Sequence, residues 1–299
     1  RATPLLGGMS VWVSFFVVLG VVFFFTDLLQ GEALQGSILG ILFAAASILI
    51  AGGYIDDRYT MPPWAQMIAP LIAAGMMTFS GVEIHVLTNP WGGVISLSLF
   101  ASRVIIFTWL MVVMYTTKLL DGLDGLATGI TGIGAAVLGA LALFTKFYQP
   151  DVAALAAILL GSCIGFLIFN FHPARIFLGE GGSTLLGFLL GILAIISGGK
   201  IATAMLVLGI PVLDVAWVVL QRLRQGKSIF LGDRRHLHFQ LLTAGFSHRG
   251  AVLFLYFLAA LFGFSTLVLQ SFGKLVALGG VVMVMVVLVL VISLRTRKI

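Results

Sequence analysis

Charge is scarce in this sequence. Only 9% of the 299 residues are Asp, Glu, Lys or Arg, whereas 60% are hydrophobic. A soluble domain has about one quarter charged residues, so this chain cannot cover a water-facing surface, and it is far too apolar for a disordered protein. Cysteine is scarce too: Cys163 stands alone, which excludes an internal disulfide framework. Apolar runs of about 18 residues or more recur from end to end instead, and they predict a polytopic helical membrane protein.

Ten apolar segments predict about ten transmembrane helices in an all-α fold. We expect them at Val11–Phe25, Ser37–Ile55, Trp64–Gly81, Phe100–Thr117, Leu126–Phe144, Val152–Asn170, Ser183–Ser197, Ile201–Leu220, Ala251–Gln270 and Leu275–Leu294. No separate soluble stretch interrupts them, which predicts a single transmembrane domain over residues 1–299. The chain starts with Arg1-Ala-Thr-Pro and shows no signal-peptide pattern there, so we expect a further segment, such as another span, to precede it.

Basic residues divide unequally between the two sides of the predicted bundle. If successive spans alternate in direction, one side carries 13 of the 17 Lys and Arg residues and the other side four. The 13 are Arg1, Arg58, Lys118, Arg175, Arg222, Arg224, Lys227, Arg234, Arg235, Arg249, Arg295, Arg297 and Lys298, and the four are Arg103, Lys146, Lys200 and Lys274. Positive loops favour the cytoplasm, so both chain ends are predicted to be cytoplasmic. The net charge of +6 therefore indicates orientation rather than nucleic-acid binding.

Carboxylates gather on the same side. Asp56 and Asp57 end the second span, and Asp121 and Asp124 lie in an Asp-Gly-Leu-Asp-Gly loop between two spans. Adjacent carboxylates repel each other and need a cation, a proton or a basic partner, whereas a spacing of three residues puts two of them on one side of a helical turn. A solvated helix end with Arg58 as counter-ion is the alternative for the first pair. Acidic residues between apolar spans usually have a functional role, so we interpret Asp121 and Asp124 as site residues.

A glycine-rich turn, Phe177–Ser183, opens the seventh span and contains Glu180. Backbone N–H groups at such a helix start can cradle a phosphate. A tight turn between packed helices is the alternative explanation of the glycines, and for this motif taken alone we favour it.

A basic histidine segment follows the eighth span. Arg234 and Arg235 stand directly before His236 and His238. Two histidines that alternate with another residue share a face only in an extended segment, which argues against a metal site. Because Arg234 and Arg235 are adjacent, the cluster is better suited to bind phosphate oxygens. The alternative is a basic segment that binds anionic lipid headgroups. Asp214, inside the eighth span, is expected to support the structure or the site rather than to catalyse.

Together these motifs predict a site for phosphoryl transfer at the bilayer surface. Carboxylates bind hard cations such as Mg²⁺, which typically bridge to phosphates, and basic side chains neutralise phosphate charge directly.

The motifs, taken in order, resemble the polyprenyl-phosphate N-acetylhexosamine-1-phosphate transferase family over nearly the whole chain. The similarity rests on Thr-Pro-x-x-Gly-Gly at 3–8, Asp-Asp at 56–57, Asp-Gly-Leu-Asp-Gly-Leu at 121–126, Asn-Phe-His-Pro-Ala-Arg-Ile-Phe-Leu-Gly at 170–179 and Asp-Arg-Arg-His-Leu-His at 233–238. The spacing His236-Leu-His238 is more similar to the WecA/TagO branch than to the MurNAc-pentapeptide branch, which favours UDP-GlcNAc as donor.

The resemblance implies a multi-pass enzyme of the cell membrane with its active site facing the cytoplasm. Such an enzyme moves a sugar 1-phosphate from a UDP-N-acetylhexosamine to a polyprenyl phosphate, releases UMP, uses Mg²⁺ or Mn²⁺, and initiates cell-envelope glycan synthesis. A homodimer is a family-level expectation.

The resemblance also implies residue roles. Asp56 and Asp57 lie near the attacking lipid phosphate, with Asp56 as the candidate base. Asp121 and Asp124 organise the nucleotide site, Asn170 supports the nucleoside and Phe177 stacks on uracil. His236 and His238 contact the diphosphate, with Arg234 and Arg235 beside them. Asp57, Asp121 and Glu180 are the candidate metal ligands.

Two positions depart from the family pattern. Lys118 stands where the family usually has Asn, and Glu180 where it usually has Asp; both positions help to hold Mg²⁺ in relatives. Protonated Lys cannot ligate a metal, whereas Glu can, with a longer reach. We hypothesise that Lys118 and Glu180 form an ion pair, or that Lys118 takes over part of the charge role of the cation. The alternatives are a shifted Mg²⁺, a catalytically inactive relative, and, from another class of protein, a lipid or ion transporter.

Overall fold

The computed structural model describes residues 3–29, 31, 36–144, 148–198, 200–226 and 235–296. Within these ranges, nine helices are long and apolar enough to cross a membrane. They are α1 (Gly7–Phe25), α2 (Gly36–Tyr59), α5 (Leu99–Leu120), α6 (Leu126–Phe144), α7 (Pro150–Asn170), α8 (Gly179–Ile196), α9 (Ile201–Arg224), α11 (His248–Ser265) and α12 (Ser271–Thr296). The all-α membrane fold is confirmed, and these nine match nine of the ten predicted spans.

The remaining predicted span, Trp64–Gly81, is not one continuous transmembrane helix, so this part of the prediction is wrong. It consists of two short helices, α3 (Pro63–Gln66) and α4 (Ile68–Thr78), which are interrupted at Met67. Pro70 has no N–H to donate to the carbonyl of Gln66, and its ring crowds that carbonyl, so the helix breaks one turn before the proline. The break leaves the Gln66 side chain at the end of α3, close to the carboxylates described below.

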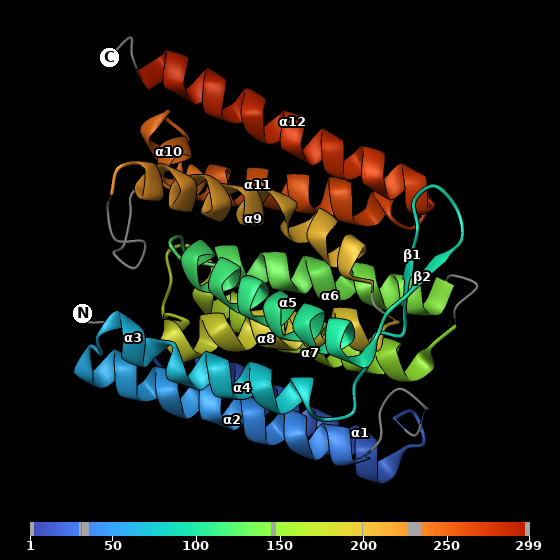
Figure 1. Cartoon of the computed structure of the whole chain (residues 1–299). Coiled ribbons are helices and arrows are strands. Elements are labelled where there is room, and N and C mark those ends of the chain that lie inside the picture. The colour runs from blue at the N-terminus through green and yellow to red at the C-terminus, as the bar shows by residue number, and fades with distance from the viewer. Residues whose placement is uncertain are drawn as a thin grey trace.

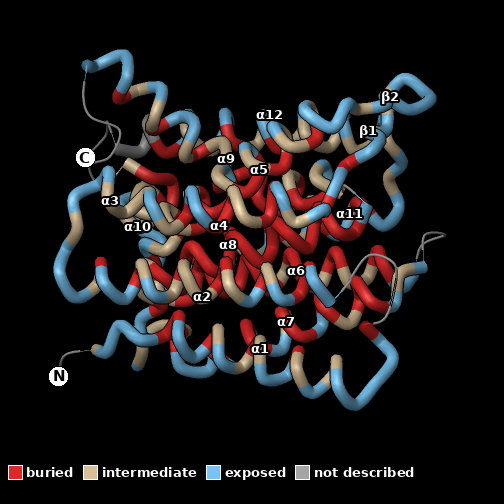
Figure 2. The backbone as a smooth tube through the Cα atoms, turned by 60° about the horizontal axis from the view of Figure 1, so that its bottom comes forward, coloured by how far each residue is buried: buried red, intermediate tan, exposed pale blue. Residues whose placement is uncertain are grey.

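The helices lie roughly side by side with α8 at the centre (Figures 1 and 2). All its residues from Gly181 to Ile196 are buried, and α8 packs against α5, α2, α1 and α6. The short helices α3 and α10 (Leu237–Thr243) lie at the same end of the bundle as both chain termini (Figure 1). A small antiparallel hairpin, β1 (Val86–Thr88) and β2 (Val94–Ser96), lies at the opposite end and was not predicted.

Glycines let α8 approach its neighbours closely at the end of the bundle that carries the termini. A Cβ added to Gly53 of α2 would lie 2.1 Å from the backbone N and Cα of Gly181, and one added to Gly8 of α1 would lie 2.4 Å from the backbone N of Gly182. The start of α1 is held there as well, because the N–H groups of Gly7 and Gly8 donate to the carbonyls of Phe177 and Leu178. These contacts support close packing as the explanation of the glycine-rich turn.

Replacement of Gly53 by alanine is expected to lower the thermal stability of the protein in detergent. The methyl group has no space against the α8 backbone, and such overpacking costs about 1–3 kcal/mol. Gly40→Ala on the same helix is the matched control, because nothing lies within 4 Å of its added Cβ. Equal melting temperatures for the two variants would contradict the observed α2–α8 packing.

Candidate active site

A pocket of about 440 Å³ lies at the end of the bundle that carries the termini, where α2, α5 and α7 end and α6 and α8 begin. It is lined by most of the residues predicted for the site. They are Asp57, Lys118, Asp121, Asp124, Asn170, Phe177 and Glu180, together with Leu5, Gly122, Leu123, Leu178, Gly179 and Ser183. Four segments far apart in the sequence, at Leu5, at Asp57, at 118–124 and at 170–183, therefore supply one cavity.

Asp56 and Asp57 point to different sides of their helix end. Asp57 lines the pocket, and its Oδ1 accepts a hydrogen bond of 3.2 Å from the N–H of Glu180 at the start of α8. Asp56 is buried behind it and accepts from the N–H of Met61 at 2.7 Å and from Nε2 of Gln66 at 3.3 Å. The geometry thus gives Asp57 access to the pocket and ties Asp56 to the turn that leads into α3.

The predicted ion pair between Lys118 and Glu180 is confirmed. Nζ of Lys118 lies 2.8 Å from Oε2 of Glu180 and donates a hydrogen bond of 2.8 Å to Oε1 of Gln66. Gln66 thereby joins Asp56 to the Lys118–Glu180 pair through one amide. Sequence reasoning missed Gln66, because only the break between α3 and α4 brings it to the site.

Four carboxylates face one ammonium group in this pocket. Burial raises the pKa of Asp121 well above its usual range, and the negative charges of Glu180, Asp124 and Asp57 raise it further. Lys118 is already paired with Glu180, so Asp57 and Asp121 are left without an equivalent cation within the pocket lining. Oxygen ligands with excess negative charge suit a divalent cation such as Mg²⁺. The chemistry of these donors therefore fits the implied metal, whereas the ligand atoms that lie within 4.8 Å of one another in the described part of the chain are those of Asp124, His172 and His248.

The Asp-Gly-Leu-Asp-Gly loop is held from several sides. Oδ1 of Asn170 accepts from the N–H of Gly125 at 3.1 Å and from the hydroxyl of Thr128 at 3.2 Å, while its Nδ2 donates to the carbonyl of Ile176. Gly125 has φ +82°, a conformation that a side chain would strain. Asn170 thus lines the pocket and also fixes the loop to the segment that carries Phe177.

The two histidines of the basic segment, His236 and His238, differ in their hydrogen-bond partners. Nδ1 of His236 is 2.8 Å from Oδ2 of Asp214, and the same carboxylate accepts from the N–H of Leu237 at 2.8 Å, which fits the expected supporting role of Asp214. His238 is buried against Gly122, with its Nε2 unpartnered in the described part of the chain. The Nη1 atom of Arg235 donates to Gln225, and Arg234 lies outside the described residues.

Protein stability is expected to decrease between pH 7 and pH 5 because of His238. Burial, together with nearby His236, lowers the pKa of His238 from 6.5 to about 3. The unfolded chain therefore binds a proton below pH 6.5 that the folded chain does not, so folding stability falls as the pH falls, by about 2 kcal/mol at pH 5. Thermal unfolding of the His238→Gln variant should show a smaller loss over this range. An identical pH dependence in both proteins would contradict the buried neutral histidine.

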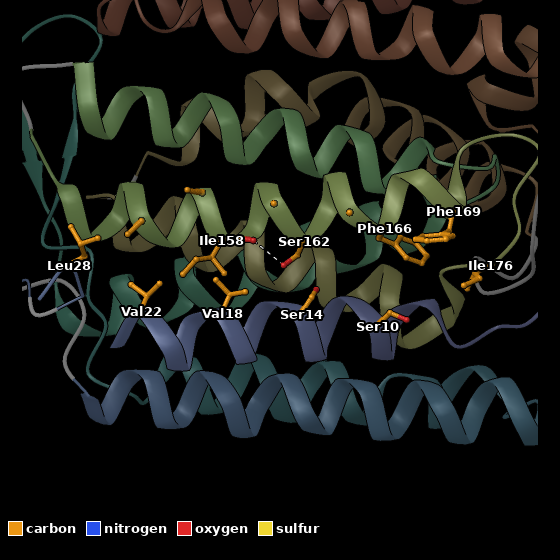
Figure 3. Close-up of a pocket in the computed structure, with 14 residues that line it drawn as sticks. Ser10, Ser14, Val18, Val22, Leu28, Ile158, Ser162, Phe166, Phe169 and Ile176 are labelled. Atoms are coloured by element: carbon orange, nitrogen blue, oxygen red, sulfur yellow. Dashed lines mark hydrogen bonds between the residues drawn. The ribbon is translucent and has the colours of Figure 1, made fainter. Parts of the chain in front are cut away.

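Another described cavity, of about 620 Å³, is an open groove between α1 and α7 (Figure 3). Its lining is apolar or small, as with Val18, Ile158 and Gly161, and contains no titratable side chain. Ile176 lines this groove, and the next residue, Phe177, lines the carboxylate pocket. This groove cannot supply charge for phosphate chemistry, so the carboxylate pocket is the candidate active site.

Fold and site together define an integral-membrane protein with an acidic pocket at one end of its helix bundle, suited to a phosphorylated substrate. The chain belongs to glycosyl transferase family 4, whose model matches residues 38–198.

Several relatives are similar over most of the chain. The probable undecaprenyl-phosphate N-acetylglucosaminyl 1-phosphate transferase of Bacillus subtilis is 29% identical over 91% of this chain and 74% of its own length. The decaprenyl-phosphate N-acetylglucosaminephosphotransferase of Mycolicibacterium smegmatis is 30% identical over 99% of this chain and 80% of its own length. The phospho-N-acetylmuramoyl-pentapeptide-transferase of Moorella thermoacetica is 39% identical, but over only 52% of this chain and 48% of its own length.

Proposed function

We propose that the protein transfers N-acetylglucosamine 1-phosphate from a UDP-sugar to a polyprenyl phosphate and releases UMP. The observation that carries this proposal is the pocket, which combines Asp57, Asp121, Asp124 and Glu180 with Lys118 at one end of a membrane-spanning bundle. Relatives aligned over most of the chain are named for N-acetylglucosamine transfer to prenyl phosphates. The relative named for the muramoyl-pentapeptide aligns with about half of it, which favours N-acetylglucosamine as the sugar.

The reaction exchanges one phosphoanhydride bond for another. An oxygen of the lipid phosphate attacks the sugar-bearing phosphorus of the UDP-sugar, and the bond to the UMP oxygen breaks, so UMP leaves with the electron pair. Catalysis rests on positioning and on neutralisation of the phosphate charges. Lys118 supplies a fixed positive charge at the pocket wall. Phe177 also lines the pocket, is about 39% exposed, and offers a ring on which the uracil can stack. Asp57, Asp121 and Glu180 would hold a divalent cation, which would supply further neutralisation of the phosphate charges.

The site is proposed to face the cytoplasm. The described basic residues of the predicted cytoplasmic loops, such as Lys118, Arg175, Arg222 and Arg249, belong to helix ends and loops on the pocket side of the bundle. Positive loops are retained in the cytoplasm, where UDP-sugars are made.

The proposed reaction is tested by measuring UMP release from purified protein given undecaprenyl phosphate, Mg²⁺ and either UDP-GlcNAc or UDP-MurNAc-pentapeptide. Release with UDP-GlcNAc alone is the expected result. Release with UDP-MurNAc-pentapeptide alone would overturn the choice of sugar but not the reaction class. Folded protein that binds uridine nucleotide and releases no UMP with either donor would be an inactive relative, and folded protein that binds none would favour the transporter alternative.

A further inference from the structure

A histidine that no motif identified lies against the Asp-Gly-Leu-Asp-Gly loop. His248 lies in the first turn of α11, and its Nε2 accepts a hydrogen bond of 3.0 Å from the backbone N–H of Asp124. The two residues are 124 positions apart in the sequence. An imidazole nitrogen accepts only when it carries no proton, so the contact requires the neutral form of His248 with its proton on Nδ1.

The carboxylate of Asp124 is held at the same time. Its Oδ2 is 2.8 Å from Nδ1 of His172 and accepts from the N–H of Ala174 at 3.1 Å. The rings of His172 and His248 stack with their centroids 4.0 Å apart and their planes at 13°. Backbone and side chain of Asp124 are therefore clamped by one stacked pair of imidazoles.

The neighbours of this pair reinforce the clamp. Nε of Arg249 donates to the carbonyl of His172 at 2.9 Å, and the hydroxyl of Tyr256, two turns further along α11, donates to the carbonyl of Gly125. Ser247 caps α11 by accepting from the N–H of Gly250, which fixes the first turn that carries His248. Helix α11 thus holds the carboxyl end of the loop whose two aspartates line the pocket.

We propose that His248 is a positioning residue of the transfer site: it sets the backbone of Asp124, and through His172 the direction of the Asp124 carboxylate. The inference deepens the proposed function and rests on it for the reaction it serves. Asp124, His172 and His248 also offer three ligand atoms within 4.8 Å of one another, which would suit a transition metal. The geometry favours the clamp, because Nε2 of His248 and Oδ2 of Asp124 already have hydrogen-bond partners.

The proposal is tested with His248→Ala and His248→Gln. The Gln amide oxygen can replace Nε2 as acceptor, whereas Ala cannot. Amide hydrogen exchange over residues 119–127 should be faster in the Ala variant and close to that of the unmodified protein in the Gln variant. UMP release at saturating substrate should fall about 10- to 100-fold in the Ala variant, with much of it rescued by Gln. His85→Ala, which removes an exposed histidine at the other end of the bundle, should change neither measurement.

Unchanged hydrogen exchange in the Ala variant would overturn the clamp, whether or not the protein is active. Faster exchange with unchanged turnover would overturn the role in transfer. One bound transition-metal ion per chain in the unmodified protein, absent from both variants, would replace the clamp with a metal site. A lack of UMP release by the unmodified protein would instead refute the proposed function, and hydrogen exchange would still decide the clamp.

Discussion

Asp57→Asn is expected to release UMP at least about 100-fold more slowly than the unmodified protein, because a carboxylate that handles charge or protons at a reacting phosphate contributes about 10²–10⁴. Asp57 lines the pocket beside Asp121 and Glu180, and its replacement removes one negative charge from the set that would hold a cation. Asparagine keeps the oxygen that accepts from the N–H of Glu180, so the start of α8 should stay in place. The variant should therefore fold and bind nucleotide while turnover is lost.

Asp56→Asn is the matched comparison, since it makes the same chemical change one residue away. Asp56 is buried, and one of its oxygens is already occupied by the N–H groups of Met61 and Gln66. Asparagine can preserve these contacts, so the loss of UMP release should be much smaller than for Asp57→Asn. The resemblance to the family predicts the reverse, with Asp56 as the base. A larger loss for Asp56→Asn, in protein of normal thermal stability, would support that assignment over the one favoured by the pocket geometry.

Lys118→Asn is expected to make UMP release far more dependent on Mg²⁺. The ammonium group of Lys118 lies 2.8 Å from Glu180 and provides a fixed positive charge in a pocket with four carboxylates. A charge-assisted contact is worth about 1.5–3 kcal/mol, so its loss should lower the rate without added divalent cation by about 10- to 100-fold. Saturating Mg²⁺ should restore much of the rate, because Glu180 is then free to serve as a ligand.

Two variants control this experiment. Lys118→Arg keeps the charge and should keep the low requirement for Mg²⁺. Lys200→Asn removes a lysine that also donates to a glutamine amide oxygen, but at the other end of the bundle, and should leave the Mg²⁺ titration unchanged. Binding of Mn²⁺, followed by electron paramagnetic resonance, should be tighter in Lys118→Asn than in the unmodified protein. An unaltered Mg²⁺ titration and unaltered Mn²⁺ binding in Lys118→Asn would refute the charge role of Lys118.

The sequence determined the membrane class, nine of the spans and most of the pocket lining. Apolar length is a property of contiguous residues, and the bilayer requires it, so it can be seen without any tertiary contact. The motifs that carry Asp57, Asp121 and Glu180 lie at span ends on one side, and alternation of the spans brings such ends together. The Lys118–Glu180 ion pair could also be predicted from the sequence, because both positions depart from the family pattern and their charges are opposite.

Only the tertiary structure decided which side chains share the pocket and which stand behind it. Asp56 and Asp57 are neighbours in the sequence, but a rotation of about 100° per residue around the helix sends one toward Gln66 and the other toward α8. Gln66 and His248 carry no local signal, because their contacts span 52 and 124 positions and depend on a broken helix and on the packing of α11. Long-range contacts of this kind are set by how the helices pack together, which composition and spacing do not encode.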